Sequence, residues 1–118
     1  MKRVRVHNVT KEAPVTEAGH ATSMWARFLG LMGKKPLPEG EALLIDPCSS
    51  VHTMFMRFPI DVVYISKENS VVKIAPEMRA WRAGLGGKGA HKVLEMLPGA
   101  AAKAGLEVGD EVGFEPLA

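Results

Sequence analysis

The stretch VHTMFMRFPIDVVYI, residues 51–65, is the most informative part of this chain. It is apolar enough for interior β-strands. Pro59 divides it, because proline cannot donate to a strand ladder and therefore belongs at a turn or at the first position of a strand. His52, Arg57 and Asp61 interrupt the apolar residues. Since an unpaired buried charge is costly, these three residues indicate either an internal ion-pair network or the wall of a pocket.

Outward from this stretch, short strand patterns fill most of the chain. We expect strands at residues 51–56 and 60–66, and further ones at residues 3–7, 15–21, 42–45, 71–75, 92–96 and 110–115. Short helices are expected at residues 24–31 and from residue 97 to Gly105. The pattern predicts a mainly β fold: one compact antiparallel β-sandwich or barrel-like domain over residues 1–118, with one or two short helices.

Composition narrows the class of protein. With 118 residues, 47% hydrophobic and 24% charged, the chain is typical of a soluble domain with one core. A net charge of +2 is too small to indicate nucleic-acid binding, and the single cysteine excludes an internal disulfide. The sequence shows neither a secretory signal nor an apolar run long enough to cross a bilayer. We therefore expect a cytoplasmic protein that contacts neither nucleic acid nor membrane.

Several short motifs are spread over nearly the whole chain. They are Arg27 with Gly30-Leu31-Met32, residues 48–53, residues 56–63, Ala80-Trp81-Arg82, Val93-Leu94-Glu95, and Gly105-Leu106 followed by Gly109-Asp110. In this order they resemble the DUF192 (UPF0127) family of small bacterial and archaeal domains. The resemblance implies a small β-sandwich-like fold and implies no reaction.

A metal site is one interpretation of the central stretch. His52, Met54 and Met56 would share one face of a strand, and such a set suits a soft ion such as Cu(I). Alternate strand residues lie roughly 6.6–7 Å apart, so the three cannot all reach one ion; two of them with Cys48 could. Methionine more often fills gaps in a core. We expect no metal and no other cofactor.

Cys48 and His52 suggest a thiol–imidazole pair. In such a pair the imidazole removes the thiol proton, and a carboxylate such as Asp61 orients the ring. The alternative is that Cys48 is a small packed thiol without reactivity. Whether the chain is an enzyme is left open by these residues.

Arg27 is the single cation of an apolar predicted helix. We expect its guanidinium to bond a buried carboxylate, Asp61 first and Glu95 otherwise, in a structural ion pair. A contact from these residues to a ligand is the alternative.

Basic residues surround a glycine-rich segment at residues 79–89. Arg79, Trp81, Arg82, Lys88 and Lys92 could hold an anion, with Trp81 stacking on a flat group, or could form a solvated loop. The segment is not a P-loop, because its spacing fails and neither serine nor threonine follows Lys88.

The loop at residues 46–50 and the loop at residues 79–89 are expected to converge beside His52. The sequence therefore predicts a binding module for a small anionic or peptide-like partner, with a concave site bordered by Cys48, His52, Arg57, Trp81 and Arg82. Two alternatives remain: a Cys48/His52-dependent hydrolase or transferase, and a purely structural or interaction domain.

Overall fold

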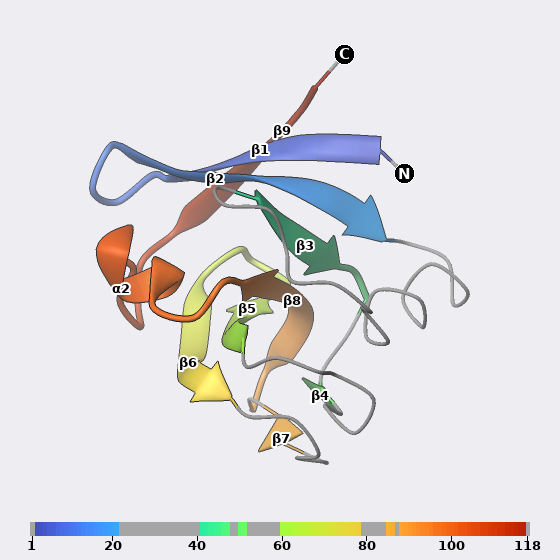
Figure 1. The fold of residues 1–118 in the computed structure, drawn as a ribbon, viewed down its shortest axis with the longest axis vertical. Coiled ribbons are helices and arrows are strands. Elements are labelled where there is room, and N and C mark those ends of the chain that lie inside the picture. Colours follow the sequence, from blue (N-terminus) through green and yellow to red (C-terminus); the bar gives the residue numbers. More distant parts are fainter. Residues whose placement is uncertain are drawn as a thin grey trace.

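The computed structural model describes residues 2–21, 41–47, 50–51, 60–78, 85–86 and 88–117. Strands dominate this part of the chain (Figure 1). The strands are β1 (Lys2–Asn8), β2 (Ala13–Ala21), β3 (Glu41–Ile45), β4 (Ser50–Val51), β5 (Ile60–Ser66), β6 (Val71–Met78), β7 (Leu85–Gly86), β8 (Ala90–Met96) and β9 (Val112–Pro116). Helix α2 spans Ala100–Lys103. None of the helices in these ranges is long and apolar enough to cross a membrane.

The main sheet has the strand order β6-β5-β8-β3-β2-β1-β9. Its neighbours are antiparallel except for β2 and β3, which run parallel. The expected mainly β, largely antiparallel class is therefore confirmed, with the refinement that the sheet is mixed. The expected helix at residues 24–31 and the strand residues 52–56 lie outside the described ranges.

The two edge strands of this sheet meet at one end. The Val71 N–H donates to the Asp110 carbonyl at 2.8 Å, the Gly109 N–H donates to the Val71 carbonyl at 2.8 Å, and the Val112 N–H donates to the Asn69 carbonyl at 2.8 Å. These bonds satisfy edge groups that would otherwise be open to pairing with another chain. The sheet is thus curled into a barrel-like form, as Figure 1 shows.

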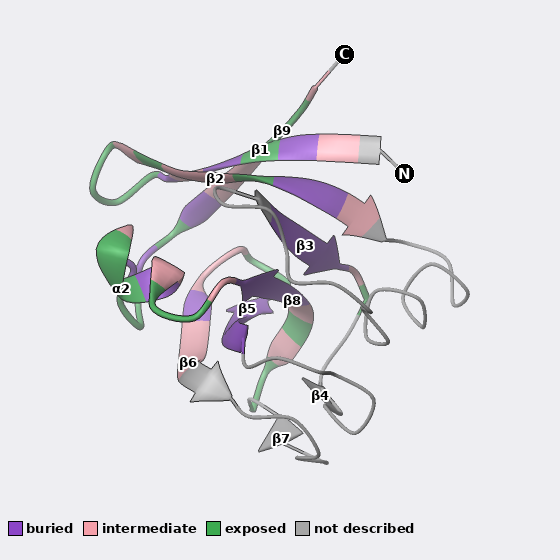
Figure 2. Ribbon diagram, viewed as in Figure 1, coloured by how far each residue is buried: buried purple, intermediate pink, exposed green. Residues whose placement is uncertain are grey.

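The main core lies inside the curl. Its buried residues come from strands all around the sheet and from the α2 region: Val4, Val6, Ala18, Ala42, Leu44, Val63, Ile65, Val71, Leu94, Met96, Ala101, Leu106 and Val112. Burial follows the strands of the sheet in Figure 2. All seven residues of β5 are buried, because both faces of this strand are covered, and its sequence therefore does not alternate between apolar and polar residues.

A second apolar cluster occupies the opposite face of β5 and β8. It consists of Ile60, Val62, Tyr64 and Val93, each with no exposed surface, and we call it the outer cluster. The two faces follow from strand alternation, since Val63 and Ile65 of the same strand point into the main core.

Candidate functional site

The residues expected to border the ligand site lie outside the described ranges. These are Cys48, His52, Arg57, Trp81 and Arg82, and Arg27 lies outside them as well. The structure does describe the short strands next to them in the sequence, and the geometry of the candidate site is built from those strands and from the carboxylates Asp61 and Glu95.

Strands β4 and β7 form a separate two-stranded antiparallel sheet. Ser50 pairs with Gly86, and Val51 pairs with Leu85. Strand β4 starts two residues after Cys48 and ends immediately before His52, while β7 starts three residues after Arg82. The backbones of the two segments named as converging loops are thus hydrogen-bonded to each other close to the candidate residues (Figure 1).

Glu95 is a buried carboxyl group on β8. Only 2% of the residue is exposed, and its Oε2 has no hydrogen-bond partner within the described part of the chain. Its cross-strand neighbours are Leu43 on β3 and Val62 on β5. Burial among apolar groups disfavours the charged form and raises the pKa of Glu95 to about 8. At neutral pH the group is therefore mainly a neutral carboxyl.

Asp61 on β5 is also buried, but it has backbone partners. Its Oδ1 accepts from the Gly99 N–H at 3.1 Å, and its Oδ2 accepts from the Ala101 N–H at 3.0 Å. Gly99 is the N-cap of α2 and has no side chain to cap the helix. Asp61 satisfies N–H groups that a helix start leaves open. Its expected bond to Arg27 stays a prediction.

A group of three side chains was missed by the sequence reasoning. His20 at the end of β2 and His91 on β8 both approach Asp46, which follows β3: His20 Nε2 lies 3.9 Å from Asp46 Oδ2, and His91 Nε2 lies 3.7 Å from Asp46 Oδ1. The three residues are far apart in the sequence. Only the order of the strands in the sheet, which places β2, β3 and β8 side by side, could have predicted that these side chains meet. In the ranges that the structure covers, no three His, Cys, Asp or Glu side chains are arranged to hold a metal ion.

The side chain of Lys92 makes other contacts than those expected for one of the basic residues around the glycine-rich segment. Its Nζ donates to Asn69 Oδ1 at 2.6 Å and lies 5.2 Å from the centre of the Phe114 ring. These contacts engage the ammonium group with the β5–β6 turn and with β9. Lys92 therefore contributes to sheet structure rather than to the glycine-rich loop.

Comparisons with solved structures support the fold. A crystal structure from Sinorhizobium meliloti 1021, described as a "putative transcription regulator", aligns with a TM-score of 0.80 at 18% identity and covers 96% of this chain and 92% of that one. A protein of unknown function from Novosphingobium aromaticivorans DSM 12444 aligns with a TM-score of 0.77 at 22% identity, over 94% of this chain and 83% of that one. At these identities the likeness shows the fold.

The sequence comparisons show the family. The UPF0127 protein of Pyrococcus furiosus is 32% identical over 116 residues, which cover 93% of this chain and 97% of that protein. The model of the DUF192 family, described as "Uncharacterized ACR", matches residues 5–114. The expected resemblance is thereby confirmed, and the chain belongs to the DUF192 family.

Proposed function

We propose that this protein is a binding module for a small anionic or peptide-like partner, held beside the β4–β7 pair. Cys48, His52, Arg57, Trp81 and Arg82 border the proposed site. The site acts by non-covalent binding rather than by covalent chemistry. A cytoplasmic location remains a prediction from the sequence.

The observation that carries this proposal is the pairing of Val51 with Leu85. Paired strand residues have Cα atoms about 4.5–5.5 Å apart. His52 follows Val51 directly, and Trp81 precedes Leu85 by four residues, or at most about 14 Å of extended chain. The pairing thus supports a site that His52 and Trp81 share, although the two residues are far apart in the sequence.

Loops held by a rigid scaffold carry binding more often than core residues do. Here the scaffold is the curled sheet, and Ala90, which starts β8 shortly after β7, packs against the outer cluster. Arginine and an aromatic side chain suit an anionic or planar group, because the guanidinium forms paired hydrogen bonds and the ring offers a face for stacking.

Nuclear magnetic resonance tests the proposal with benzoate as an anionic probe and acetyl-Gly-Gly as a peptide-like one. We expect at least one probe to shift the amide signals of Ser50, Val51, Leu85 and Gly86, and to leave the amides of the turn at residues 67–70 in place. His52→Ala and Trp81→Ala should each abolish these shifts while the melting temperature changes by a few degrees.

The matched control is His7→Ala, since His7 lies on β1, outside the β4–β7 pair, and the variant should respond like the wild type. Shifts confined to other strands, or no shift with either probe, would contradict the proposal. A large loss of stability in both His52→Ala and Trp81→Ala would favour the structural alternative instead.

A Cys48-dependent enzyme is the second candidate, and one observation favours it. Asp46 lies two residues before Cys48 in the sequence, and its carboxylate lies within 4 Å of an imidazole nitrogen of both His20 and His91. Alkylation separates the candidates: an activated Cys48 reacts rapidly with iodoacetamide at neutral pH, whereas a packed thiol reacts slowly.

A further inference from the structure

The seam between the two edge strands of the barrel runs along a short segment after α2, residues 105–111, which we call the seam segment. The Val71 N–H donates to the Asp110 carbonyl at 2.8 Å, and the Gly109 N–H donates to the Val71 carbonyl at 2.8 Å. Ser70 also forms an isolated antiparallel bridge with Glu111. These bonds bring the start of β6 to the segment that leads into β9.

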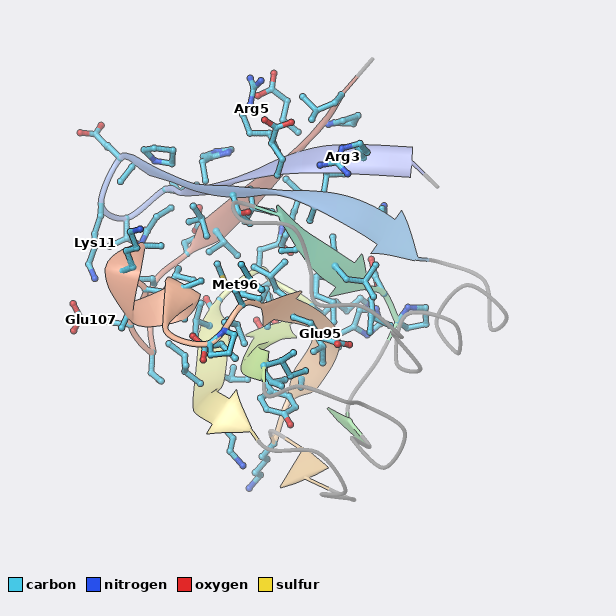
Figure 3. The ribbon with its side chains drawn as sticks, in the orientation of Figure 1. Arg3, Arg5, Lys11, Glu95, Met96 and Glu107 are labelled. Carbon is cyan, nitrogen blue, oxygen red and sulfur yellow. The ribbon has the colours of Figure 1, made fainter. Side chains whose placement is uncertain are left out.

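The β1–β2 turn holds the same segment from its other side through Lys11. The Lys11 Nζ donates to the Gly105 carbonyl at 2.5 Å and to Glu107 Oε1 at 2.6 Å, and it lies 3.1 Å from Asp110 Oδ2. Figure 3 shows the Lys11 side chain extending from this turn toward Glu107. One ammonium group thus contacts oxygen atoms near the start, the middle and the end of the seam segment.

Asp110 connects the contacts of Lys11 to the seam itself. Its backbone carbonyl accepts from Val71, while its Oδ2 accepts from Asn8 Nδ2 at 2.8 Å and from the Glu107 N–H at 3.0 Å. The hydrogen bond from Asn8 is the main cause that lowers the pKa of Asp110 below its ordinary value of 3.8, so the group is a carboxylate at neutral pH. A shift of this side chain moves the carbonyl that pairs with β6.

The ammonium contacts lie at the surface, whereas the seam segment also reaches the core. The side chain of Lys11 is 34% exposed and that of Glu107 is 74% exposed, but Leu106 belongs to the main core. Ion pairs in contact with water depend on the charge of both partners and weaken as salt rises. The seam segment is therefore held in part by an exposed charge that can be removed without touching the core.

We propose that Lys11 is a latch: its ammonium group holds the seam segment against the β1–β2 turn, and loss of that charge opens the seam between β6 and β9 while the other strands stay paired. Opening frees the Val71 N–H and carbonyl and withdraws Leu106 from the main core. Free backbone groups at the edge of a sheet can pair with another strand. The inference does not depend on the proposed binding site.

Amide hydrogen exchange of the full chain, followed by nuclear magnetic resonance, tests the latch. The reporters are the amides of Val71, Gly109 and Val112, whose hydrogen bonds lie at the seam, and the references are the amides of the interior strands β3 and β8. In Lys11→Met, which keeps an unbranched side chain but removes the charge, the reporters should exchange at least about tenfold faster and the references within about twofold of the wild type.

Two further variants separate the charge from other effects. Lys11→Arg keeps a cation, and its reporter amides should exchange within about threefold of the wild type. Lys103→Met is the matched control, because it removes the same charge from an exposed position on α2, close to the seam segment in the sequence. All amides of this control should exchange as in the wild type.

Salt supplies an independent readout on the unaltered protein. Raising sodium chloride from about 0.05 M to about 0.5 M should speed exchange of the three reporter amides in the wild type and leave them unchanged in Lys11→Met, since screening acts on the latch. Equal exchange in the wild type and Lys11→Met would overturn the proposal. Equal acceleration in every strand would also overturn it and assign Lys11 to overall stability. If Lys11→Met fails to fold, the wild type decides: reporters that do not respond to salt contradict the latch.

Discussion

The protonation of Glu95 links a single side chain to the stability of the protein. Its pKa rises from an ordinary value of 4.5 to about 8 on folding. Between these two values the folded state holds a proton that the unfolded state has lost. The contribution of Glu95 to stability is therefore largest below pH 4.5 and declines as the pH rises toward 8.

The replacement Glu95→Gln should remove this dependence. The stability difference between the variant and the wild type should grow in favour of the variant from pH 5 to pH 8, by on the order of a few kcal/mol. Urea denaturation of both proteins at several pH values measures it, since the other groups titrate alike and cancel in the difference. Curves that stay parallel across this range would show that Glu95 is already ionised in the folded state.

The other buried carboxylate shows why two acids in similar apolar stretches have different roles. Asp61 and Glu95 both lie among apolar residues in the sequence, and we predicted from this that both carboxyl groups are buried. Both are buried in the structure. Their partners could not be predicted, because Asp61 meets backbone groups that lie 38 and 40 residues further along the chain. The proposed bond from Arg27 to either acid remains a prediction.

At the scale of elements, Asp61 joins α2 to β5. Removing its side chain in Asp61→Ala leaves the Gly99 and Ala101 N–H groups without an acceptor near a buried position. We expect a loss of about 2–5 kcal/mol, measured by urea denaturation. Asp61→Asn keeps one acceptor oxygen and should lose less.

Glu68→Ala provides the control, because Glu68 lies exposed in the β5–β6 turn and should change stability by less than about 0.5 kcal/mol. A loss in Asp61→Ala no larger than that of the control would show that α2 does not depend on β5. A double-mutant cycle with Arg27→Met then tests the predicted ion pair, since contacting residues couple by about 0.5–3 kcal/mol.

Several elements were predictable because their signals are local. The apolar run at residues 60–66 coincides with β5, and the short alanine helix ends where Gly105, at φ 75°, was expected to end it. Leu106 packs back into the core and is 5% exposed. Strand β7 was missed, because Leu85–Gly86 lies in a glycine-rich segment whose extended form comes from pairing with β4 rather than from residue propensity.

At the scale of the whole molecule, the curled sheet separates two environments. The main core fills the inside, and the opposite face of β5 and β8 carries the outer cluster and Glu95. Strand order decides this division, and a sequence cannot supply it, since residues such as His20, Asp46 and His91 meet only after β2, β3 and β8 become neighbours. The sequence predicted that the loops at residues 46–50 and 79–89 converge, and the pairing of β4 with β7 supports this prediction.

The most direct test of the binding site is a crystal structure of the protein with benzoate, in which His52 and Trp81 are seen together with the probe. We expect benzoate between these two side chains, with one oxygen atom or its ring within contact of each. A structure in which His52 and Trp81 lie more than about 15 Å apart, beyond the reach of about four extended residues, would contradict it.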